Sequence, residues 1–228
     1  MKTTQIELAK RWIDIDNSPD HQKRLQEWLN TENWTALEEC LGSRLQFGTA
    51  GLRGTVGPGT NRMNRGMVQQ TALGIAQYVT AQSLPKSAVI GFDARNDSLQ
   101  FAQDVADVLH HEGFNVELFD QPSPTPIVAY AVGWLKATVG VVITASHNPA
   151  PDNGFKVYWS NGAQIIPPVD TGIAQAIEQI SSVPVWKTHI SGTQHSAPPP
   201  ALIEDYFASI KNVRITPATG AHLVYTPM

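Results

Sequence analysis

Cysteine is nearly absent from this sequence, and charge is spread thinly along it. Cys40 is the single cysteine, so the chain has no partner for an internal disulfide and no cysteine cluster for a metal ion. The 16 lysines and arginines are scattered among 20 aspartates and glutamates, which gives a formal net charge of −4. Proteins that bind nucleic acid gather basic residues into a patch or stripe. Nucleic acid is therefore not an expected partner.

Long apolar runs are missing as well. No segment approaches the roughly 18 consecutive apolar residues that cross a bilayer, and the N-terminal stretch MKTTQIELAKRWIDID lacks the apolar centre of a signal peptide. The sequence thus predicts a cytoplasmic protein that does not enter a membrane. What it has instead is a globular composition, because 42% of its residues are hydrophobic and 16% are charged. That proportion suffices for a sizeable core.

Helical and strand patterns alternate through the middle of the chain. Apolar residues recur at helical spacing over 64–81, 98–112 and 125–135, and short apolar segments predict strands over 88–92, 115–119 and 137–144. The segment 137–144 is apolar almost throughout, which is typical of a strand buried on both faces. The alternation predicts an α/β fold with helices on both faces of a largely parallel sheet.

The two ends of the chain differ from this middle part. Residues 1–40 have the polar, helical pattern of an extension that packs one face on the body of a protein. The Pro-, Ser- and Thr-rich stretch 182–200 predicts a linker, and a helix over 201–210 and a strand over 221–225 follow it. One helix and one strand do not close a core. We therefore expect the truncated start of a second domain; the alternative is a complete protein whose last strand joins the first sheet.

The segment TASHNP contains the first candidate site. Ligands of open α/β sheets collect beyond the carboxyl ends of the strands, so Ser146 is expected at this rim, on a turn favoured by Asn148 and Pro149. A hydroxyl on a tight turn can carry a covalent group. His147 can hydrogen-bond a phosphate or move a proton. The spacing alone favours a serine that makes only a local turn bond.

Lys156 lies on the predicted strand 154–160, which an Asn161-Gly162 turn joins to 163–166 as a hairpin. Strand alternation places Lys156 on the face opposite Phe155 and Val157. If those apolar residues face the core, the lysine points over the loop at 146, where an amine can hold a phosphate or shift a proton. An ordinary solvated lysine is the alternative.

Two further loops contain residues suited to anions. In FGTAGLRGT, residues 47–55, the glycines let backbone amides turn toward an anion, and Arg53 offers a planar fork for phosphate oxygens. Glycine-rich loops also occur as simple turns. The segment GFDARNDS, residues 91–98, ends a strand and starts a helix, a favourable place for an anion. There Asp93 and Arg95 are expected mainly to pair and to hold the loop.

Taken together, RLQFGTAGLRG, GFDARNDS, TASHNP, NGFKVYW and LVYTPM resemble the α-D-phosphohexomutase superfamily. The N-terminal helical extension is similar to that of its phosphoglucomutase/phosphopentomutase-like branch, and the likeness runs from about residue 12 to 228. The resemblance implies that the first domain is a layered, mixed β-sheet with helices on both faces. It also implies a division into the helical extension 1–40, the first domain 41–184, a linker 185–200 and the truncated start of a similar second domain, 201–228.

The resemblance further implies an isomerase that converts a sugar 1-phosphate into the 6-phosphate, or a pentose 5-phosphate, through a bisphosphate. Ser146 then carries the phosphoryl group and binds Mg²⁺ through that phosphate, with glucose 1,6-bisphosphate as activator. The implied catalytic residues are Ser146, Lys156, Arg53 and His147, with Lys156 as general acid/base. The implied phosphate and substrate contacts are Thr49, Gly51, Arg53 and Asn148. Glucose 1-phosphate is the favoured substrate, followed by ribose or deoxyribose 1-phosphate, and then mannose 1-phosphate.

The family's Asp-rich metal loop and sugar-discriminating loop do not occur in this sequence. The resemblance therefore implies that the remaining Mg²⁺ ligands lie in a missing part of the second domain, and that the 228-residue chain alone has negligible mutase activity. A module that binds phosphosugars without catalysis, and a defective fragment, are the alternatives from other classes. The expected partner is a small phosphosugar. The sequence does not indicate an oligomeric state.

Overall fold

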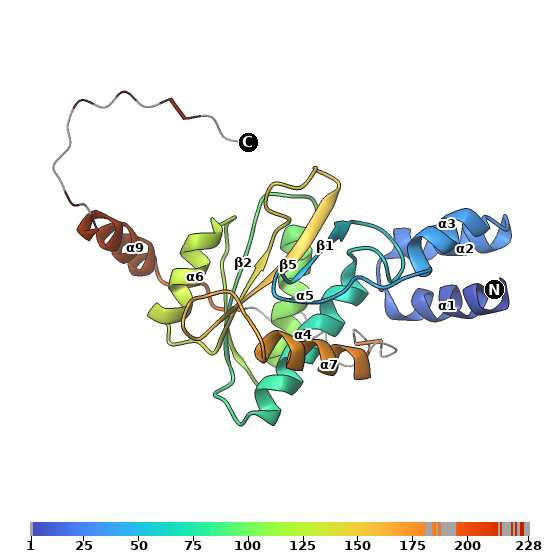
Figure 1. Cartoon of the computed structure of the whole chain (residues 1–228), viewed down its shortest axis with the longest axis horizontal. Helices are drawn as coiled ribbons and strands as arrows, with labels where there is room; N and C mark the ends of the chain where they lie inside the picture. The colour runs from blue at the N-terminus through green and yellow to red at the C-terminus, as the bar shows by residue number, and fades with distance from the viewer. Residues whose placement is uncertain are drawn as a thin grey trace.

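The structure is a computed structural model, and it describes residues 2–180, 184–185, 187, 195–213, 215, 220, 222 and 224–225. At one end lie the helices α1 (Lys2–Ile15), α2 (Pro19–Asn30) and α3 (Trp34–Leu41), as the sequence predicts (Figure 1). They pack against one another, and Trp12, Leu25 and Leu37 bury their side chains in the same core cluster as the body of the protein. None of the described helices is long and apolar enough to span a membrane.

The body is built on a five-stranded sheet with the strand order β1-β5-β4-β2-β3. Its strands are β1 (Leu52–Thr55), β2 (Ser87–Phe92), β3 (Asn115–Leu118), β4 (Val139–Ile143) and β5 (Asp152–Trp159). β3, β2 and β4 run parallel, β5 is antiparallel to β4, and β1 is antiparallel to β5. The sheet is therefore mixed, as the family resemblance implies. All five residues of the central strand β4 are buried, in agreement with its continuous apolar sequence.

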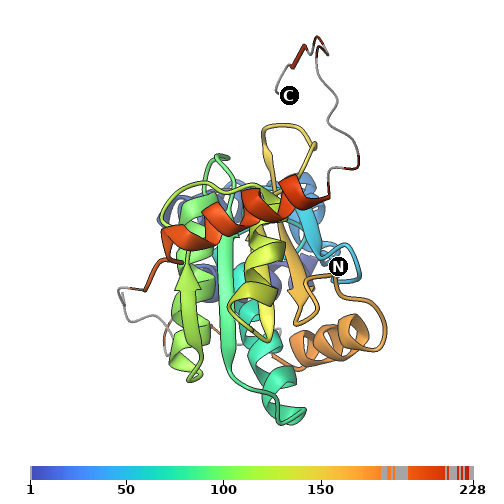
Figure 2. The ribbon, with the colours of Figure 1, turned by 90° about the vertical axis from the view of Figure 1, so that its left-hand side faces the viewer.

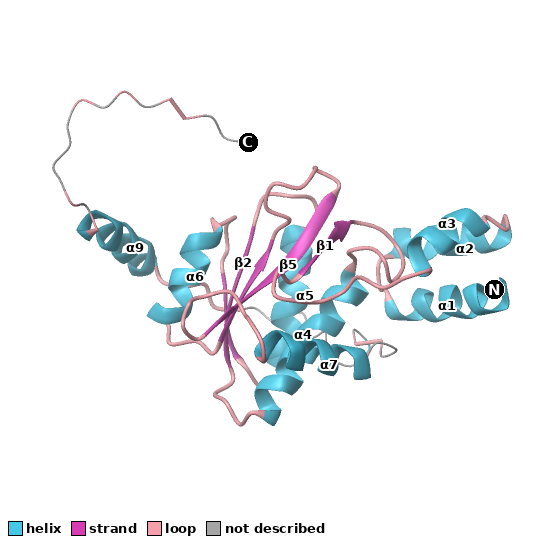
Figure 3. Cartoon of the chain, in the orientation of Figure 1, coloured by secondary structure: helices cyan, strands magenta, loops and turns pink. Residues whose placement is uncertain are grey.

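Helices cover both faces of the sheet (Figures 2 and 3). On one face α4 (Arg65–Ala81) packs against α5 (Ser98–His111) and α7 (Val169–Gln179). On the other face α6 (Thr125–Trp134) packs on β2 and β4, and α9 (Pro200–Asn212) packs on α6. Strand alternation separates two apolar layers, because Ile90 and Val141 join the first cluster whereas Val89 and Val142 join the second.

Two predicted elements are not found as strands. The return arm of the hairpin, 163–166, pairs with β5 through a single bridge between Tyr158 and Gln164, and it then reaches Pro167, which has no N–H for a ladder. The strand expected at 221–225 lies partly outside the described residues, and its described residues, 222, 224 and 225, are not in a strand. The linker expected over 182–200 also lies largely outside the described residues. Where it is described, Ser196 forms a parallel bridge with Glu117 of β3.

Candidate functional site

The Ser146 loop begins where β4 ends. Thr144 still donates its N–H to the Gly154 carbonyl at 3.0 Å, and the Ser146 N–H bonds the Thr144 hydroxyl at 2.9 Å. Ser146 then adopts a left-handed backbone conformation with φ of 61°, which residues with a Cβ seldom adopt. The turn closes through the Asn148 N–H, which donates to the Ala145 carbonyl at 3.1 Å. As a result, the Ser146 side chain is exposed at the rim of the sheet, as the sequence predicts.

An open pocket of about 530 Å³ lies between this loop and the loop that follows β2. Its lining residues are Asp93, Ala94, Arg95, Asn96, Ser146, His147, Asn148 and Ala150. His147 Nδ1 lies 3.5 Å from Ser146 Oγ, at the outer limit of a hydrogen bond. The pair therefore lacks the short contact of an activated serine–histidine couple, although both side chains face the same space.

Arg95 anchors the Ser146 loop from behind. Its Nη2 donates to the carbonyls of Ser146 at 3.0 Å and Asn148 at 2.8 Å. Its Nη1 donates to the carbonyls of Pro149 at 2.8 Å and Asp152 at 3.1 Å. Asp93 accepts from Arg95 Nε at 3.1 Å and from the Ser98 hydroxyl at 2.7 Å, which ties the arginine to the start of α5. The expected pairing of Asp93 with Arg95 is present, and the pair holds the loop.

Lys156 and Arg53 form a second group on the sheet beside this loop. Lys156 lies on β5 opposite Val142, and only 9% of its surface is exposed, so it is not an ordinary solvated lysine. Burial, and then the nearby Arg53 guanidinium, lower the pKa of Lys156, while Asp93 acts in the opposite direction. Arg53 lies on β1, and its Nε is buried without a partner among the described residues. Two close cations with an unsatisfied donor favour a bound anion.

Thr49 and Gly51 have other contacts. The Thr49 hydroxyl donates to Asp170 of α7 at 2.7 Å, and this bond is the main reason that the pKa of Asp170 is lowered. Gly51 has φ of 77°, and a Cβ there would lie 1.8 Å from the Phe155 carbonyl oxygen. These two residues thus fix the glycine-rich turn against α7 and β5. They are not in the pocket at Ser146, and their role in phosphate binding stays a prediction.

The described residues do not build a complete Mg²⁺ site. Among them, no three His, Cys, Asp or Glu side chains lie close enough together to hold a metal ion. The carboxylates of Asp93 and Asp152, next to the Ser146 loop, both have protein partners: Asp93 as described, and Asp152 with Asn148 Nδ2 at 3.0 Å and the Thr55 hydroxyl at 2.8 Å.

Sequence reasoning missed one supporting residue, Asn153. Its fully buried Nδ2 donates to the Asn96 carbonyl and to the Ser98 hydroxyl, each at 3.0 Å. Asn153 thereby ties the start of β5 to the loop after β2. In the sequence it stands in Asp-Asn-Gly, a turn-like run, and nothing local indicates partners more than fifty residues away.

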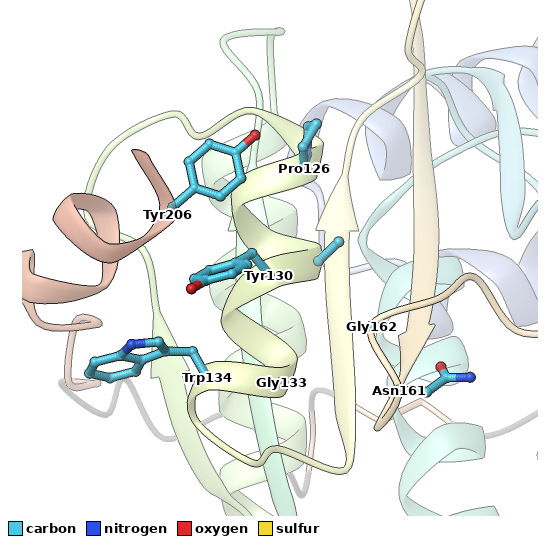
Figure 4. Close-up of a pocket in the computed structure, with 8 residues that line it drawn as sticks. Pro126, Tyr130, Gly133, Trp134, Asn161, Gly162 and Tyr206 are labelled. Carbon is cyan, nitrogen blue, oxygen red and sulfur yellow. The ribbon is translucent and has the colours of Figure 1, made fainter. Parts of the chain in front are cut away.

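A second, larger groove of about 580 Å³ lies over α6, between α9 and the turn at Asn161 (Figure 4). Its described lining is Pro126, Ala129, Tyr130, Gly133, Trp134, Asn161, Gly162 and Tyr206, and none of these side chains carries a positive charge. The Tyr130 hydroxyl is bonded to Asp205 at 2.6 Å. This lining offers no cation, whereas the smaller pocket is lined by the Ser146 hydroxyl and by the His147 and Asn148 side chains.

The fold and the site define an α/β domain that presents a serine hydroxyl on a left-handed turn, with the buried Lys156 and the half-buried Arg53 on the neighbouring strands β5 and β1. Residues 44–184 match the model of the phosphoglucomutase/phosphomannomutase family, alpha/beta/alpha domain I. The chain therefore belongs to this family, as the motif resemblance implies.

Several relatives are similar over most of the chain. A phosphopentomutase of Mus musculus is 40% identical over 88% of this chain and 34% of its own length. A phosphoglucomutase of Staphylococcus epidermidis is 34% identical over 97% of this chain and 41% of its own length. The chain thus spans between a third and two-fifths of these curated relatives.

Solved structures resemble the chain as well. A protein of Thermus thermophilus, described as a candidate phosphomannomutase, has a TM-score of 0.61 at 25% identity over 75% of this chain and 36% of its own. A phosphoglucomutase/phosphomannomutase family protein of Burkholderia thailandensis has a TM-score of 0.55 at 21% identity over 73% of this chain and 35% of its own. The second likeness concerns the fold alone.

Proposed function

We propose that this chain supplies the phosphoryl-carrying domain of a phosphosugar mutase, with Ser146 as the carrier. The observation that carries this proposal is the exposed Ser146 hydroxyl, held in a left-handed turn at the mouth of a pocket. Family membership and the phosphopentomutase and phosphoglucomutase relatives support it.

In the proposed transfer, the oxygen of Ser146 attacks a phosphorus atom of a sugar bisphosphate. The serine O–P bond forms, the P–O bond to the sugar breaks, and the serine proton leaves while the sugar oxygen gains one. The bisphosphate itself forms when the phosphoryl group already on Ser146 passes to the free hydroxyl of a sugar monophosphate; because the Ser146 oxygen then takes the phosphate from the other end of that bisphosphate, the monophosphate that leaves is the isomer. Catalysis of this kind rests on positioning and on charge stabilisation more than on covalent chemistry by the protein.

Lys156 is the proposed proton carrier of this step. Its lowered pKa brings the ammonium group nearer to the range in which a lysine exchanges protons at neutral pH. Arg53, with its unsatisfied Nε, is the proposed donor to phosphate oxygens. His147 and Asn148 line the pocket and are proposed to contact the sugar phosphate. A bound Mg²⁺, held in part by the phosphate on Ser146, would offset charge on the transferring group.

Glucose 1-phosphate is the first proposed substrate. A pentose 1-phosphate is the second, and the higher identity to phosphopentomutases, 40% against 34% for a phosphoglucomutase, favours it. The two candidates are separated by supplying both sugar phosphates to the same enzyme and measuring which of them is converted faster. The expected partner in either case is a small phosphosugar.

Phosphopeptide mapping tests the proposal. The full chain is incubated with Mg²⁺ and ³²P-labelled glucose 1,6-bisphosphate, beside Ser146→Ala and the control Ser160→Ala, whose serine lies exposed in another turn. We expect label on Ser146 in the unchanged chain and in the control, and none in Ser146→Ala.

Turnover needs a longer protein, because the chain spans 41% of the S. epidermidis phosphoglucomutase. A chimera in which this chain replaces the matching part of that enzyme is expected to interconvert glucose 1-phosphate and 6-phosphate. Ser146→Ala is expected to abolish that activity. Absence of label on Ser146, together with unchanged turnover by the Ser146→Ala chimera, would reject the proposal.

A further inference from the structure

We infer that Arg95 is a positioning residue for phosphoryl transfer: its guanidinium fixes the backbone from Ser146 to Asp152 and so sets the direction of the Ser146 hydroxyl. The inference rests on the function proposed for Ser146. It concerns a residue that does not itself touch the phosphoryl group.

Every side-chain N–H group of Arg95 donates a hydrogen bond to another residue of the protein. A guanidinium has five N–H groups in a fixed plane. Four of them bond the carbonyls of Ser146, Asn148, Pro149 and Asp152, and the fifth bonds Asp93. No N–H group of Arg95 remains for a sugar phosphate, although the residue lines the pocket. Arg53, with its unsatisfied buried Nε, is in the opposite situation.

The loop needs such an anchor because of its backbone. Ser146 has a left-handed conformation that a Cβ disfavours. The bond from Arg95 Nη2 to the Ser146 carbonyl, at 3.0 Å, fixes the peptide plane that follows this residue. Without that bond, Ser146 is free to return to a common conformation, and its hydroxyl turns away from its present direction.

The same bond also sets a backbone donor. In a trans peptide the C=O and N–H groups point in opposite directions, so the His147 N–H points away from the guanidinium. In the part of the chain that the structure describes, this N–H has no hydrogen-bond partner. This N–H is thereby placed to donate to an oxygen of a phosphate on Ser146, as backbone donors do in other anion sites.

Lysine does not replace this arrangement, since its three donors radiate from one nitrogen and have no planar fork. The test therefore compares Arg95→Lys in the full chain with Arg65→Lys as the matched control. Arg65 also makes a two-pronged bond from a mostly buried side chain, to Asp104 at 2.7 and 2.6 Å, but on α4, outside the Ser146 pocket.

The first measurement is the intraresidue HN–Hα NOE of Ser146 by NMR, which is strong only when φ is positive. We expect it in the unchanged chain and in Arg65→Lys, and we expect its loss in Arg95→Lys. This measurement does not depend on phosphoryl transfer to Ser146. If the unchanged chain takes no label from glucose 1,6-bisphosphate and the Ser146→Ala chimera keeps its turnover, the proposed function fails, and the NOE still decides whether Arg95 holds Ser146.

The second measurement is the rate of Ser146 labelling against the concentration of glucose 1,6-bisphosphate. We expect Arg95→Lys to lower the limiting rate about 100-fold, the usual effect of a misplacement near 1 Å, while the half-saturating concentration changes less than about threefold. On labelling, the His147 amide signal is expected to shift in the unchanged chain. An unchanged NOE and rate in Arg95→Lys, or a raised half-saturating concentration with an unchanged rate, would overturn the inference.

If Arg95→Lys folds poorly, chemical rescue of a second variant separates loss of the guanidinium from loss of folding. Arg95→Ala with millimolar guanidinium is expected to regain labelling, whereas ammonium at the same concentration is not. Equal loss of rate in Arg65→Lys and Arg95→Lys, at equal folded fractions, would assign the effect to general destabilisation and overturn the inference.

Discussion

The Ser146 loop and the glycine-rich turn at 48–51 are both tight, and both contain a hydroxyl residue, yet they are held in opposite ways. Arg95 binds the carbonyls of the first loop and leaves the Ser146 hydroxyl exposed. The second turn depends on Gly51, which packs on the Phe155 carbonyl, and its Thr49 hydroxyl is bonded to Asp170. The exposed hydroxyl thus belongs to the loop whose conformation is fixed by a different residue, and the bonded hydroxyl to the turn that depends on its own glycine.

The largest expected effect is on function, at Ser146. Ser146→Gly removes the hydroxyl but suits the left-handed backbone, so we expect complete loss of labelling by glucose 1,6-bisphosphate together with a gain in stability of about 1 kcal/mol. Urea denaturation measures the stability, and intact mass measures the label. Ser160→Gly, at a position without positive φ, is the control and should not gain stability. A loss of stability in Ser146→Gly would mean that the serine is not strained.

The next effect is on stability, at Gly51. A Cβ there collides with the Phe155 carbonyl at a positive φ, so Gly51→Ala is expected to lower the free energy of unfolding by about 3 kcal/mol. Gly48→Ala is the matched control in the same turn, because a Cβ at Gly48 meets nothing within 4 Å. Equal urea midpoints for the two variants would contradict the close packing of Gly51.

The burial of Lys156 is tested by the pH dependence of the free energy of unfolding. Burial lowers its pKa in the folded chain, so the charged form opposes folding below that pKa, and this cost disappears as the pH rises toward the ordinary lysine value of about 10.4. Lys156→Met is therefore expected to raise the free energy of unfolding at neutral pH, with a difference that shrinks toward about pH 10. Urea denaturation across this range, with the exposed Lys10 changed to Met as control, checks the trend. A difference independent of pH would contradict it.

The smallest effect is expected at Thr49. Thr49→Val removes its bond to Asp170 but keeps the shape of the side chain, so we expect a fall of a few degrees at most in melting temperature and no change in Ser146 labelling. Differential scanning calorimetry and intact mass check both points. A large fall in labelling would support the role of Thr49 in phosphate binding that the family resemblance implies.

Local sequence patterns predicted the layers of this fold well. Helical spacing located α4, α5 and α6, and the apolar run at 137–144 located the buried strand β4. The mixed character of the sheet came only from the resemblance, because periodicity does not encode strand direction, and the structure alone shows that β1 and β5 are the antiparallel strands. The hairpin arm at 163–166 was overestimated, since a turn signal does not show how far pairing continues before Pro167.

Sequence patterns predicted the parts of the site that consist of neighbouring residues. They did not predict the contacts between residues that lie far apart in the sequence. Ser146, His147 and Asn148 line one pocket, as their adjacency in TASHNP suggests. The bond of Thr49 to Asp170 spans 121 positions, and the bond of Arg95 to the Asp152 carbonyl spans 57. Such contacts depend on the strand order of the sheet, which no local motif contains.

The bridge at Ser196 has a consequence for association between molecules. β3 is an edge strand, and unpaired edges invite pairing with strands of other chains. The Leu118 N–H donates to the Ser196 carbonyl at 2.8 Å, so backbone between α7 and α9 occupies part of that edge. Ser196, which lies on the connection between the two faces of the sheet, therefore also shields this part of β3 from strand addition.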